Sequence, residues 1–337
     1  RRKIVAAMMR APAFWTGDGR GIMPLLLSPI AAVYASATAR RMRRPGWRAP
    51  VPVICCGNAT AGGAGKTTVA LDLGQRLANR GVAVHYLLRG YGGRLKGPVR
   101  VDPAVHTTVD VGDEALLLAA ERPAWVSGDR GAGAQAAVAS GAQAIVMDDG
   151  LQNPTLEKDL SLLVIDGSYG FGNGRIIPAG PLREPVLAAA RRAQAAVLIG
   201  EDETGALGRL PPMMPVLRAR LVPGPEASML AGQPVLAFCG IANPRKFFAT
   251  LQEAGAVLAG RQAYADHYPY DEGDLRDLVA EAESLRAILV TTRKDFVRVP
   301  PAFRARVTVV TVALAWEEPA RIEALLDPLA ARVPSPA

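Results

Sequence analysis

The residues best suited to chemistry lie in the stretch GNATAGGAGKT, which ends at Thr67. Its glycines let a loop backbone approach a ligand closely, and the loop aims several N–H groups at one point. Lys66 can reach the β- and γ-phosphates of a nucleotide, and the Thr67 hydroxyl can face Mg²⁺. The strict pattern G-x-x-x-x-G-K-[ST] fails only where Thr60 replaces a glycine. The predicted nucleotide-binding positions are Thr60, Ala61, Gly62, Gly63, Ala64, Gly65, Lys66 and Thr67.

The flanking segments support this prediction. Residues 51–56 form a short apolar, partly β-branched run, and residues 67–77 carry apolar side chains at helical spacing. A strand, a loop and a helix in this order place the positive helix N-terminus at the phosphates. A glycine-rich turn before an ordinary helix is the alternative, but the lysine and threonine at these positions favour phosphate binding.

Two acids follow the apolar run 144–147. Asp148 and Asp149 stand where a carboxylate can hold the Mg²⁺ shell opposite Thr67, although D-D-G is also typical of a solvated turn. Asp113 precedes a helix, and its spacing alone favours a helix N-cap over a catalytic role. His267 lies in the polar loop YADHYPY, and a lone loop histidine is more often incidental than catalytic.

Two glycine-rich stretches are also notable. RGYGG, beginning at Arg89, fits a flexible hairpin and a substrate loop equally well. Residues 166–185 do not fit the dinucleotide pattern G-x-G-x-x-G and do not open a helix. Because long loops in compact domains tend to be functional, we predict a functional loop there.

The elements that must position these residues alternate along the chain. We predict strands at 82–88, 144–147, 160–165 and 195–199 with helices between them, which implies a parallel sheet covered on both faces. Ligands of such sheets bind at the carboxyl ends of the strands, where the acids and the loop fall. The fold class is therefore α/β, a P-loop NTPase sheet. From about Pro234 the pattern restarts, which predicts a second, smaller α/β domain after the proline-rich stretch 211–234.

Composition and the N-terminal segment indicate which kinds of partner and surface suit the chain. The 337 residues are half apolar, with a formal charge of +8, so the folded chain offers a basic surface to phosphate, nucleic acid or an anionic membrane. Its three cysteines lack metal-type spacing and suit buried thiols.

Residues 21–39 are uncharged and are followed by RRMRR. A helix lying on the inner leaflet and a plain packed helix explain this segment equally well. The predicted divisions are 1–45 (membrane-associated helix), 46–222 (P-loop domain) and 223–337 (smaller domain).

The series GNATAGGAGKTT, RGYGG, VGDEALLLA, DDGLQN, GNGRIIPAGPLREP, ADHYPY and TTRKD resembles the motifs of the tetraacyldisaccharide 4'-kinase family over nearly the whole chain. In that family the loop reads G-N-x-[ST]-x-G-G-x-G-K-T, so Thr60 is the expected residue. The resemblance implies transfer of the γ-phosphoryl group of ATP, with Mg²⁺, to the 4'-hydroxyl of an acylated glucosamine disaccharide phosphate. It also implies peripheral attachment to the cytoplasmic face of the inner membrane, and we expect neither a nucleic-acid partner nor an obligate protein partner.

The resemblance also assigns roles. Asp113 becomes the candidate base, supported by His267. Asp148 and Asp149 match the family's acid pair, one of which lies on the metal side, and Thr67 and Asp149 are taken as the metal ligands. Glu184 and Asp295 match family positions without a role that follows from their chemistry. Asn153, Tyr268 and Arg293 depart from the usual family residues. The predicted catalytic residues are Asp113, His267, Lys66, Asp148 and Asp149.

Two other classes share the loop. Membrane-associated switch ATPases of the partitioning type carry a signature lysine before the glycine pair, where this chain has Ala61. A GTPase would be expected to show an N-K-x-D tetrad, which TRKD does not supply. The sequence therefore favours the kinase.

Overall fold

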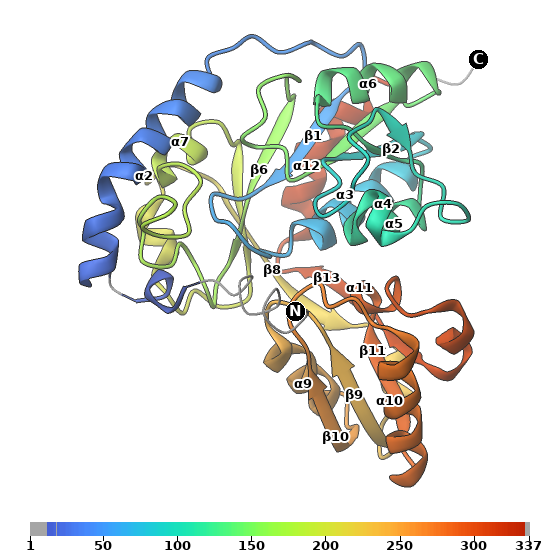
Figure 1. Ribbon diagram of the computed structural model, residues 1–337. Coiled ribbons are helices and arrows are strands. Elements are labelled where there is room, and N and C mark those ends of the chain that lie inside the picture. Colours follow the sequence, from blue (N-terminus) through green and yellow to red (C-terminus); the bar gives the residue numbers. More distant parts are fainter. Residues whose placement is uncertain (1–11, 18, 334–337) are drawn as a thin grey trace. The chain divides into compact units, whose positions relative to one another are not determined.

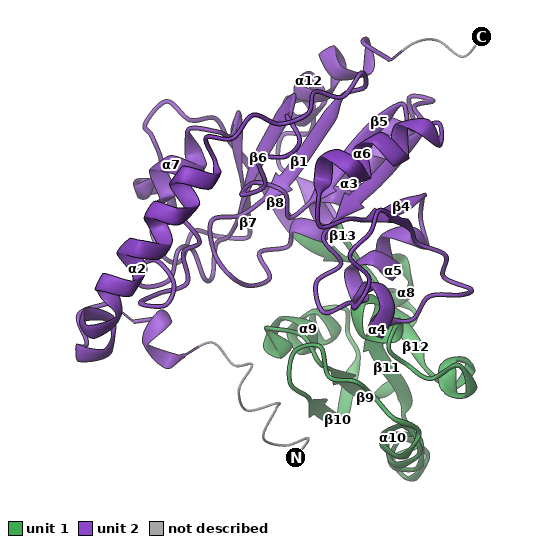
Figure 2. Ribbon diagram, turned by 45° about the horizontal axis from the view of Figure 1, so that its top comes forward, with its two compact units in different colours: residues 1–10, 221–313 green, residues 11–220, 314–337 purple. Residues whose placement is uncertain are grey.

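The computed structural model describes residues 12–17 and 19–333, so the predicted N-terminal segment 1–45 lies partly outside the described residues (Figure 1). The described chain divides into two compact units (Figure 2). The smaller unit contains Leu221–Ala313. The larger unit contains the described residues up to Arg220 and those from Leu314 onward.

A mostly parallel sheet forms the centre of the larger unit. Within the described residues it has nine strands in the order β13-β8-β7-β6-β1-β5-β2-β4-β3. The pairs from β8 to β4 are parallel, whereas the short β3 runs antiparallel to its neighbour β4. The predicted α/β fold class is confirmed. The strands are β1 (Val53–Gly57), β2 (Val84–Leu88), β3 (Val99–Arg100), β4 (Ala124–Val126), β5 (Ala144–Asp148), β6 (Leu160–Asp166), β7 (Ala195–Ile199), β8 (Val216–Pro223) and β13 (Val312–Trp316).

Helices cover both faces of this sheet, because alternate residues of each buried strand point to opposite sides. On one face, Cys55 and Met147 pack in a core with residues of α6 (Arg130–Ala139) and α7 (Val186–Ala190). On the other face, α3 (Lys66–Ala78) approaches Tyr86 of β2 so closely that Gly74 leaves no room for a side chain. Both faces are therefore buried, as the continuous apolar strands predict.

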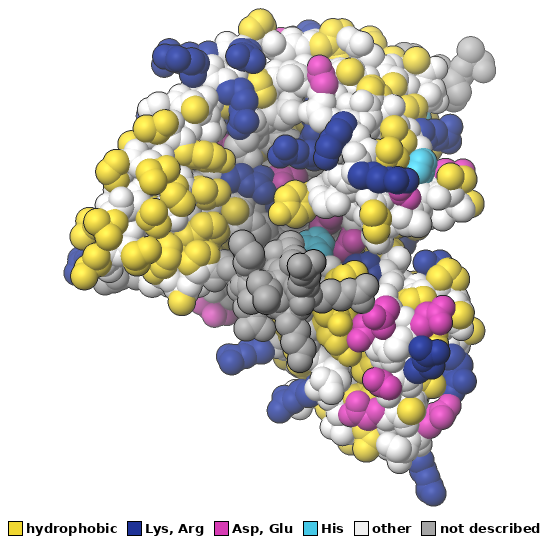
Figure 3. Space-filling view, viewed as in Figure 1, with side chains coloured by type: hydrophobic (Ala, Val, Ile, Leu, Met, Phe, Trp, Pro, Cys, Tyr) yellow, Lys and Arg dark blue, Asp and Glu magenta, His cyan; other side chains and the backbone are white. Residues whose placement is uncertain are grey.

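The helix α2 (Ile22–Arg41) confirms the predicted N-terminal helix and is unusual in what it exposes. Its buried residues, Pro24, Ala31 and Thr38, are seven residues apart and form one narrow stripe. The rest of the helix presents large apolar side chains to the outside, as the yellow region over α2 shows (Figure 3). These exposed residues are Ile22, Met23, Leu25, Leu26, Ile30, Val33 and Tyr34.

The smaller unit has its own sheet and core, in agreement with the restart of the pattern near Pro234. Among the described residues its strands run in the order β10-β9-β11-β12, all parallel. One face packs on α9 (Pro244–Glu253) and the other on α10 (Glu272–Ser284). The strands are β9 (Pro234–Cys239), β10 (Val257–Ala263), β11 (Ile288–Thr292) and β12 (Thr308–Val310).

The end of the chain differs from the predicted division at 223–337. After the smaller unit, the chain returns to the larger one as β13 and α12 (Pro319–Ala330). Glu323 of α12 forms ion pairs with Arg76 of α3 and with Arg80 just after α3, which attach the helix to the larger unit. In addition, β8 occupies part of the predicted proline-rich boundary. Its alternating sequence VLRARLVP suits a strand near the sheet edge, and prolines flank it rather than interrupt it.

Candidate active site

The glycine-rich loop joins β1 to α3 at the carboxyl end of the sheet, where the sequence predicted a phosphate-binding loop. Gly65 has φ +80, and a side chain there would meet Ile199 at 2.5 Å, so only glycine fits the turn into α3. The Asn58 side chain donates to the Thr60 hydroxyl at 3.1 Å and to the Gly62 carbonyl at 3.2 Å. The loop is thus ordered by its own polar residues.

Thr60, which breaks the strict glycine pattern, pairs with Leu182 as an isolated antiparallel β-bridge. Ala61 N–H donates to the Pro181 carbonyl at 2.7 Å, which extends this pairing. Thr60 is not among the described residues with positive φ, so its backbone does not require glycine. The partner segment belongs to the loop 166–185, whose predicted functional character remains a prediction. The structure shows that this loop holds the phosphate-binding loop in place.

Lys66 and Thr67 begin α3 and point to the two acids at the end of β5. The Lys66 ammonium is largely buried, donates to the Gly62 carbonyl at 3.3 Å and lies 3.9 Å from Asp149 Oδ1. The Thr67 hydroxyl donates to Asp148 Oδ2 at 2.7 Å. The structure therefore brings together four of the predicted site residues, with a cation and a hydroxyl facing two carboxylates.

The two neighbouring acids have different environments. Burial raises the pKa of Asp148 to about 6, and Lys66 and the Thr67 hydroxyl only partly oppose this rise. Burial would also raise the pKa of Asp149, but Lys66 and Arg183 lower it to about 2. Asp149 is therefore ionised at neutral pH and already neutralised by cations, whereas Asp148 ionises closer to neutral pH. Asp149 has φ +58, and this unusual backbone conformation turns it away from the direction of β5.

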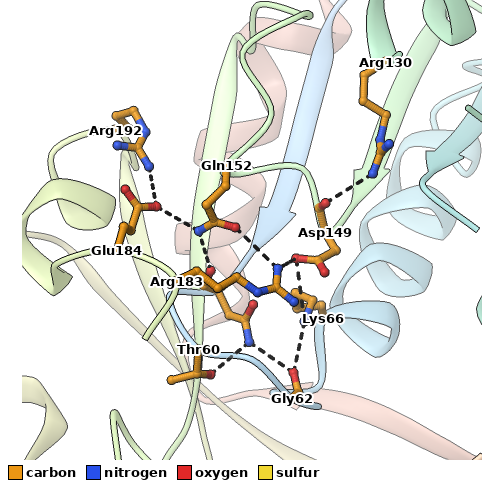
Figure 4. Close-up of polar contacts among 10 residues, drawn as sticks. Thr60, Gly62, Lys66, Arg130, Asp149, Gln152, Arg183, Glu184 and Arg192 are labelled. Carbon is orange, nitrogen blue, oxygen red and sulfur yellow. Dashed lines mark hydrogen bonds and ion pairs between the residues drawn. The ribbon is translucent and has the colours of Figure 1, made fainter. Parts of the chain in front are cut away.

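A network of charged and amide side chains surrounds Asp149 (Figure 4). Arg183 donates to Asp149 Oδ1 at 2.6 Å, and the buried Arg130 donates to the Asp149 carbonyl at 3.5 Å. Gln152 Nε2 donates to the Asn58 carbonyl and to Glu184, each at 2.8 Å. These contacts tie the acid pair, the phosphate-binding loop and the loop 166–185 into one assembly.

Glu184 gains a structural explanation in this network. Its carboxylate is buried and accepts hydrogen bonds from Gln152 at 2.8 Å and from Arg192 at 2.5 Å. Sequence reasoning did not single out Arg183, Gln152 or Arg130. Arg183 lies in the predicted functional loop 166–185, directly before Glu184, so its position could have indicated a site residue. Nothing in the sequence around Arg130 indicates a role in the site.

Asp113 is the first residue of α5 (Asp113–Ala119), and Gly112 occupies the N-cap position instead. The simple capping role that the spacing favoured is therefore not the observed one, although an acid in the first turn still suits the helix dipole. Asp113 is buried. Its neighbour Glu114 is close enough to Asp148 for its charge to raise the pKa of that acid. The start of α5 thus lies on the same side of the sheet as the acid pair.

The RGYGG stretch packs against residues 110–112, which directly precede α5. A side chain at Gly112 would meet the Tyr91 carbonyl oxygen at 2.3 Å, and one at Gly93 would meet the Asp110 carbonyl oxygen at 2.7 Å. The stretch is therefore a tightly packed turn whose backbone supports the start of α5. Arg89 and Tyr91 at its beginning are exposed, so both side chains are accessible to a ligand.

His267 belongs to the smaller unit, in the loop between β10 and α10. It has φ +58, and its Nε2 lies 3.4 Å from Lys294 Nζ and 3.8 Å from Asp266 Oδ1. The acids and the phosphate-binding loop belong to the larger unit. The predicted cooperation of His267 with Asp113 therefore stays a prediction.

The donor set near Thr67 suits a hard divalent cation. Asp148 Oδ1 is buried and has no hydrogen-bond partner among the described residues. No group of three or more His, Cys, Asp or Glu that could hold a metal occurs in the described part of the chain. Mg²⁺ commonly uses one or two protein oxygens and completes its shell with phosphate and water, so this small donor set fits it. The sequence placed Asp149 at the metal, but Thr67 contacts Asp148.

Comparisons with known proteins agree with this geometry. The sequence model of a family described as tetraacyldisaccharide-1-P 4'-kinase matches residues 23–330. A tetraacyldisaccharide 4'-kinase of Gluconacetobacter diazotrophicus is 60% identical over 319 residues, covering 95% of this chain and 98% of the relative. The enzyme of that name from Rhodospirillum rubrum is 54% identical, covering 97% and 100%. A crystal structure of LpxK from Aquifex aeolicus in complex with ATP superposes with a TM-score of 0.74 at 25% identity, covering 91% of this chain and 99% of that one.

Proposed function

Because the chain belongs to the tetraacyldisaccharide-1-P 4'-kinase family, we propose that it uses ATP to phosphorylate the 4'-hydroxyl of a tetraacyl glucosamine disaccharide 1-phosphate, giving lipid IVA. The main structural support is the phosphate-binding loop with Lys66 and the Thr67–Asp148 pair at the carboxyl end of the sheet. The related Aquifex aeolicus protein was solved with ATP, which supports ATP as the donor. The relatives are named as kinases, which disfavours a partitioning ATPase.

Phosphoryl transfer depends mainly on alignment and on neutralising charge. In our proposal Lys66 neutralises charge on the β- and γ-phosphates, and Arg183 holds Asp149 so that this acid does not compete freely for the lysine. The 4'-hydroxyl oxygen forms a bond to the γ-phosphorus while the bond to the β,γ-bridging oxygen breaks. Asp113 takes the hydroxyl proton, and His267 supports Asp113 from the smaller unit. This arrangement would make the larger unit the nucleotide-binding domain.

The central test is incubation of the purified protein with ATP, Mg²⁺ and the acylated disaccharide 1-phosphate, followed by mass spectrometry of the lipid. We expect one added phosphate and a matching amount of ADP. Omission of the lipid should leave ATP largely unhydrolysed, because the reaction needs an acceptor. ATP hydrolysis at the same rate with and without lipid, and no phosphorylated lipid, would instead identify a switch ATPase.

We also propose that Thr67 and Asp148 hold the Mg²⁺ that accompanies ATP, in place of the predicted Thr67 and Asp149. The observed hydrogen bond between them and the unpartnered Asp148 Oδ1 support this assignment. When bound, Mg²⁺ would neutralise charge on the phosphates. Asp149 then serves mainly as the partner of Lys66 and Arg183.

This assignment predicts a pH dependence. Because the pKa of Asp148 is raised to about 6, its carboxyl is increasingly protonated below that pH and must lose the proton to bind a cation. The Mg²⁺ concentration that gives half-maximal activity should therefore fall as pH rises from about 5.5 to about 7.5. Asp148→Asn should raise this concentration at least about tenfold and remove its dependence on pH. Asp149→Asn is the matched variant, and a larger rise in this variant would return the metal to Asp149.

We propose that α2 attaches the protein peripherally to the cytoplasmic face of the inner membrane. By length and composition α2 could cross a membrane. Its contacts with the protein include polar ones: Arg175 donates to the Ser28 hydroxyl at 3.0 Å and to the carbonyl of Gly19, just before the helix, at 2.8 Å. The exposed apolar residues and the exposed arginines after them suit a helix lying among anionic headgroups. A helix packed only as part of a water-soluble surface would expose polar side chains instead.

The membrane proposal predicts that removal of residues 1–39 abolishes most binding to anionic vesicles. A sharper test is the double substitution Leu26→Asp and Val33→Asp, since these side chains are 67% and 70% exposed and do not support the core. We expect at least about tenfold weaker vesicle binding with unchanged thermal stability. Met229→Asp, at a 79% exposed position of the smaller unit, is the control. Unchanged vesicle sedimentation of the double variant would show that α2 is an ordinary packed helix.

A further inference from the structure

A buried carboxylate connects the strand ends of the smaller unit. Asp295, in the short helix α11 (Arg293–Phe296), is 0% exposed. Its Oδ1 accepts hydrogen bonds from Gly240 N–H at 2.7 Å, from the Tyr270 hydroxyl at 2.8 Å and from Arg298 Nη2 at 2.7 Å. Its Oδ2 accepts from the Thr292 hydroxyl at 2.6 Å. Four donors therefore converge on one side chain, and two of them, Gly240 and Tyr270, come from segments far away in the chain.

Arg298 extends this connection to the backbone of two loops. Its side chain is 3% exposed and forms an ion pair with Asp295. Its Nη1 donates to the Tyr268 carbonyl at 3.0 Å, and its Nη2 donates to the Gly240 carbonyl at 3.1 Å. Its guanidinium also lies 5.5 Å from the centre of the Tyr270 ring. Since a buried arginine needs a compensating charge, Asp295 is what allows Arg298 to occupy this position.

Gly240 is the point at which these contacts reach His267. Its carbonyl accepts a hydrogen bond from His267 N–H at 3.1 Å, and its own N–H is held by Asp295. A side chain at Gly240 would lie 2.8 Å from the Ala265 carbonyl oxygen, so the two backbones are in close contact. The position of the His267 backbone is thus determined by Gly240, which is itself fixed by Asp295.

His267 needs such support because its own conformation is unfavourable. Its φ of +58 lies in the left-handed region, which residues other than glycine rarely adopt and which persists only where the surroundings enforce it. The imidazole is further placed by Lys294, which lies 3.4 Å from Nε2 and 3.6 Å from Asp266 Oδ1. Asp295 follows Lys294 in the chain, but the described residues show no hydrogen bond between Asp295 and His267. Asp295 can therefore influence the histidine only through other residues.

We propose that Asp295 is the positioning residue for His267, holding the loop 264–270 in the conformation that presents the imidazole. It acts through Gly240 and through the Arg298 and Tyr270 side chains. This gives the TTRKD motif a function: its aspartate fixes the loop, and its lysine contacts the histidine. The kinetic consequence depends on the proposed role of His267 in catalysis, whereas the structural consequence does not.

The structural test uses the imidazole NMR signals of ¹⁵N-labelled protein. The chain has three histidines, and loss of one signal set in His267→Ala assigns the residue. In Asp295→Asn we expect the His267 signals to shift or broaden, while those of His85 and His106 in the larger unit stay in place. Asp277→Asn, at an exposed position of α10, is the control and should change none of them. Unchanged His267 signals in a folded Asp295→Asn protein would overturn the proposal.

A second variant covers the case in which Asp295→Asn does not fold. Tyr270→Phe removes one of the four donors and keeps the ring on which the guanidinium lies, so the unit should remain folded. It should shift the His267 signals in the same direction by a smaller amount. No shift in this variant, with an unfolded Asp295→Asn protein, would make Asp295 a residue of general stability and reject the positioning role.

Kinetics then separate this inference from the proposed function. Asp295→Asn should lower kcat at least about tenfold with little change in the KM for ATP, and it should add little to the loss in His267→Ala. Additive losses in the double variant would reject the action through His267. If His267→Ala alone retains full kcat, the proposed catalytic role of His267 fails, while the NMR result still decides whether Asp295 positions it.

Discussion

Lys66→Ala is expected to lower kcat by about 10² to 10³-fold while the fold stays intact, corresponding to about 3–4 kcal/mol of lost transition-state stabilisation. The ammonium is buried at the start of α3 and is directed to the place where the loop would hold the β- and γ-phosphates. Charge on the β,γ-bridging oxygen grows as the bond breaks, so the loss should fall on the transition state more than on ATP binding.

Steady-state kinetics with saturating lipid and a thermal melt would measure this effect. Removal of Lys66 also takes from Asp149 a cation that lowers its pKa alongside Arg183 and Arg130, so the melt must show that the site remains folded. Lys246→Ala, in α9 of the smaller unit, controls for the loss of a lysine in general. A loss of kcat smaller than about tenfold would contradict the role assigned to Lys66.

Asp113→Ala and His267→Ala are each expected to lower kcat by about 10²-fold or more with little change in the KM for ATP. The reason is that neither residue is assigned to the nucleotide in the ground state. The double variant should be little worse than Asp113→Ala alone, because groups that act as a unit lose their joint contribution when either is removed. The acidic limb of the kcat–pH profile, which reports protonation of the base, should disappear in Asp113→Ala.

Asp271→Ala provides a control for helix-end effects. Asp271 is a true N-cap, since its side chain accepts from Asp274 N–H at the start of α10. Its loss should cost about 1 kcal/mol of stability and leave kcat unchanged. If Asp113→Ala resembles this variant, or if the losses at Asp113 and His267 are fully additive with the acidic limb retained, then Asp113 is a residue of the helix start and not the base.

Local sequence patterns were sufficient to predict a glycine-rich loop between a strand and a helix, and the strands β1, β2, β5, β6 and β7 of the larger sheet. The apolar runs that precede Gly57 and Asp148 are buried strands, and the residues that follow them lie at the carboxyl end of the sheet. Why threonine replaces glycine at position 60 of the strict loop pattern is explained only by the fold. Thr60 pairs with Leu182, far away in the chain, so the backbone there is held by a bridge and needs no glycine.

Other parts of the site depend on tertiary contacts that no local pattern contains. The run before Asp148 predicts where β5 ends but not which of two successive carboxylates meets Thr67, and the left-handed conformation of Asp149 decides that. Arg183 and Gln152 become site residues only because the loop 166–185 folds onto the phosphate-binding loop.

The same reasoning applies to the end of the chain. The helix α12 has an ordinary amphipathic sequence, and the ion pairs that join it to the larger unit involve Arg76 of α3 and Arg80 just after α3. The alternation in β8 was concealed by the prolines around it, which are typical of a linker. A boundary drawn from composition therefore falls close to the start of the smaller unit but misses the return of the chain.

That return has a consequence for the order of folding during synthesis. β8 and β13 are neighbours in one sheet, yet residues 224–311 are synthesised between them. When β8 leaves the ribosome, α3 still lacks Trp316, which donates to Asp72 at 2.8 Å, and Glu323. The larger unit thus cannot complete its sheet until the intervening segment has been translated. Because β8 and β13 lie side by side, a folded intervening segment reduces the entropic cost of closing the gap between them, and the larger unit reaches its final form only after Glu323 has been made.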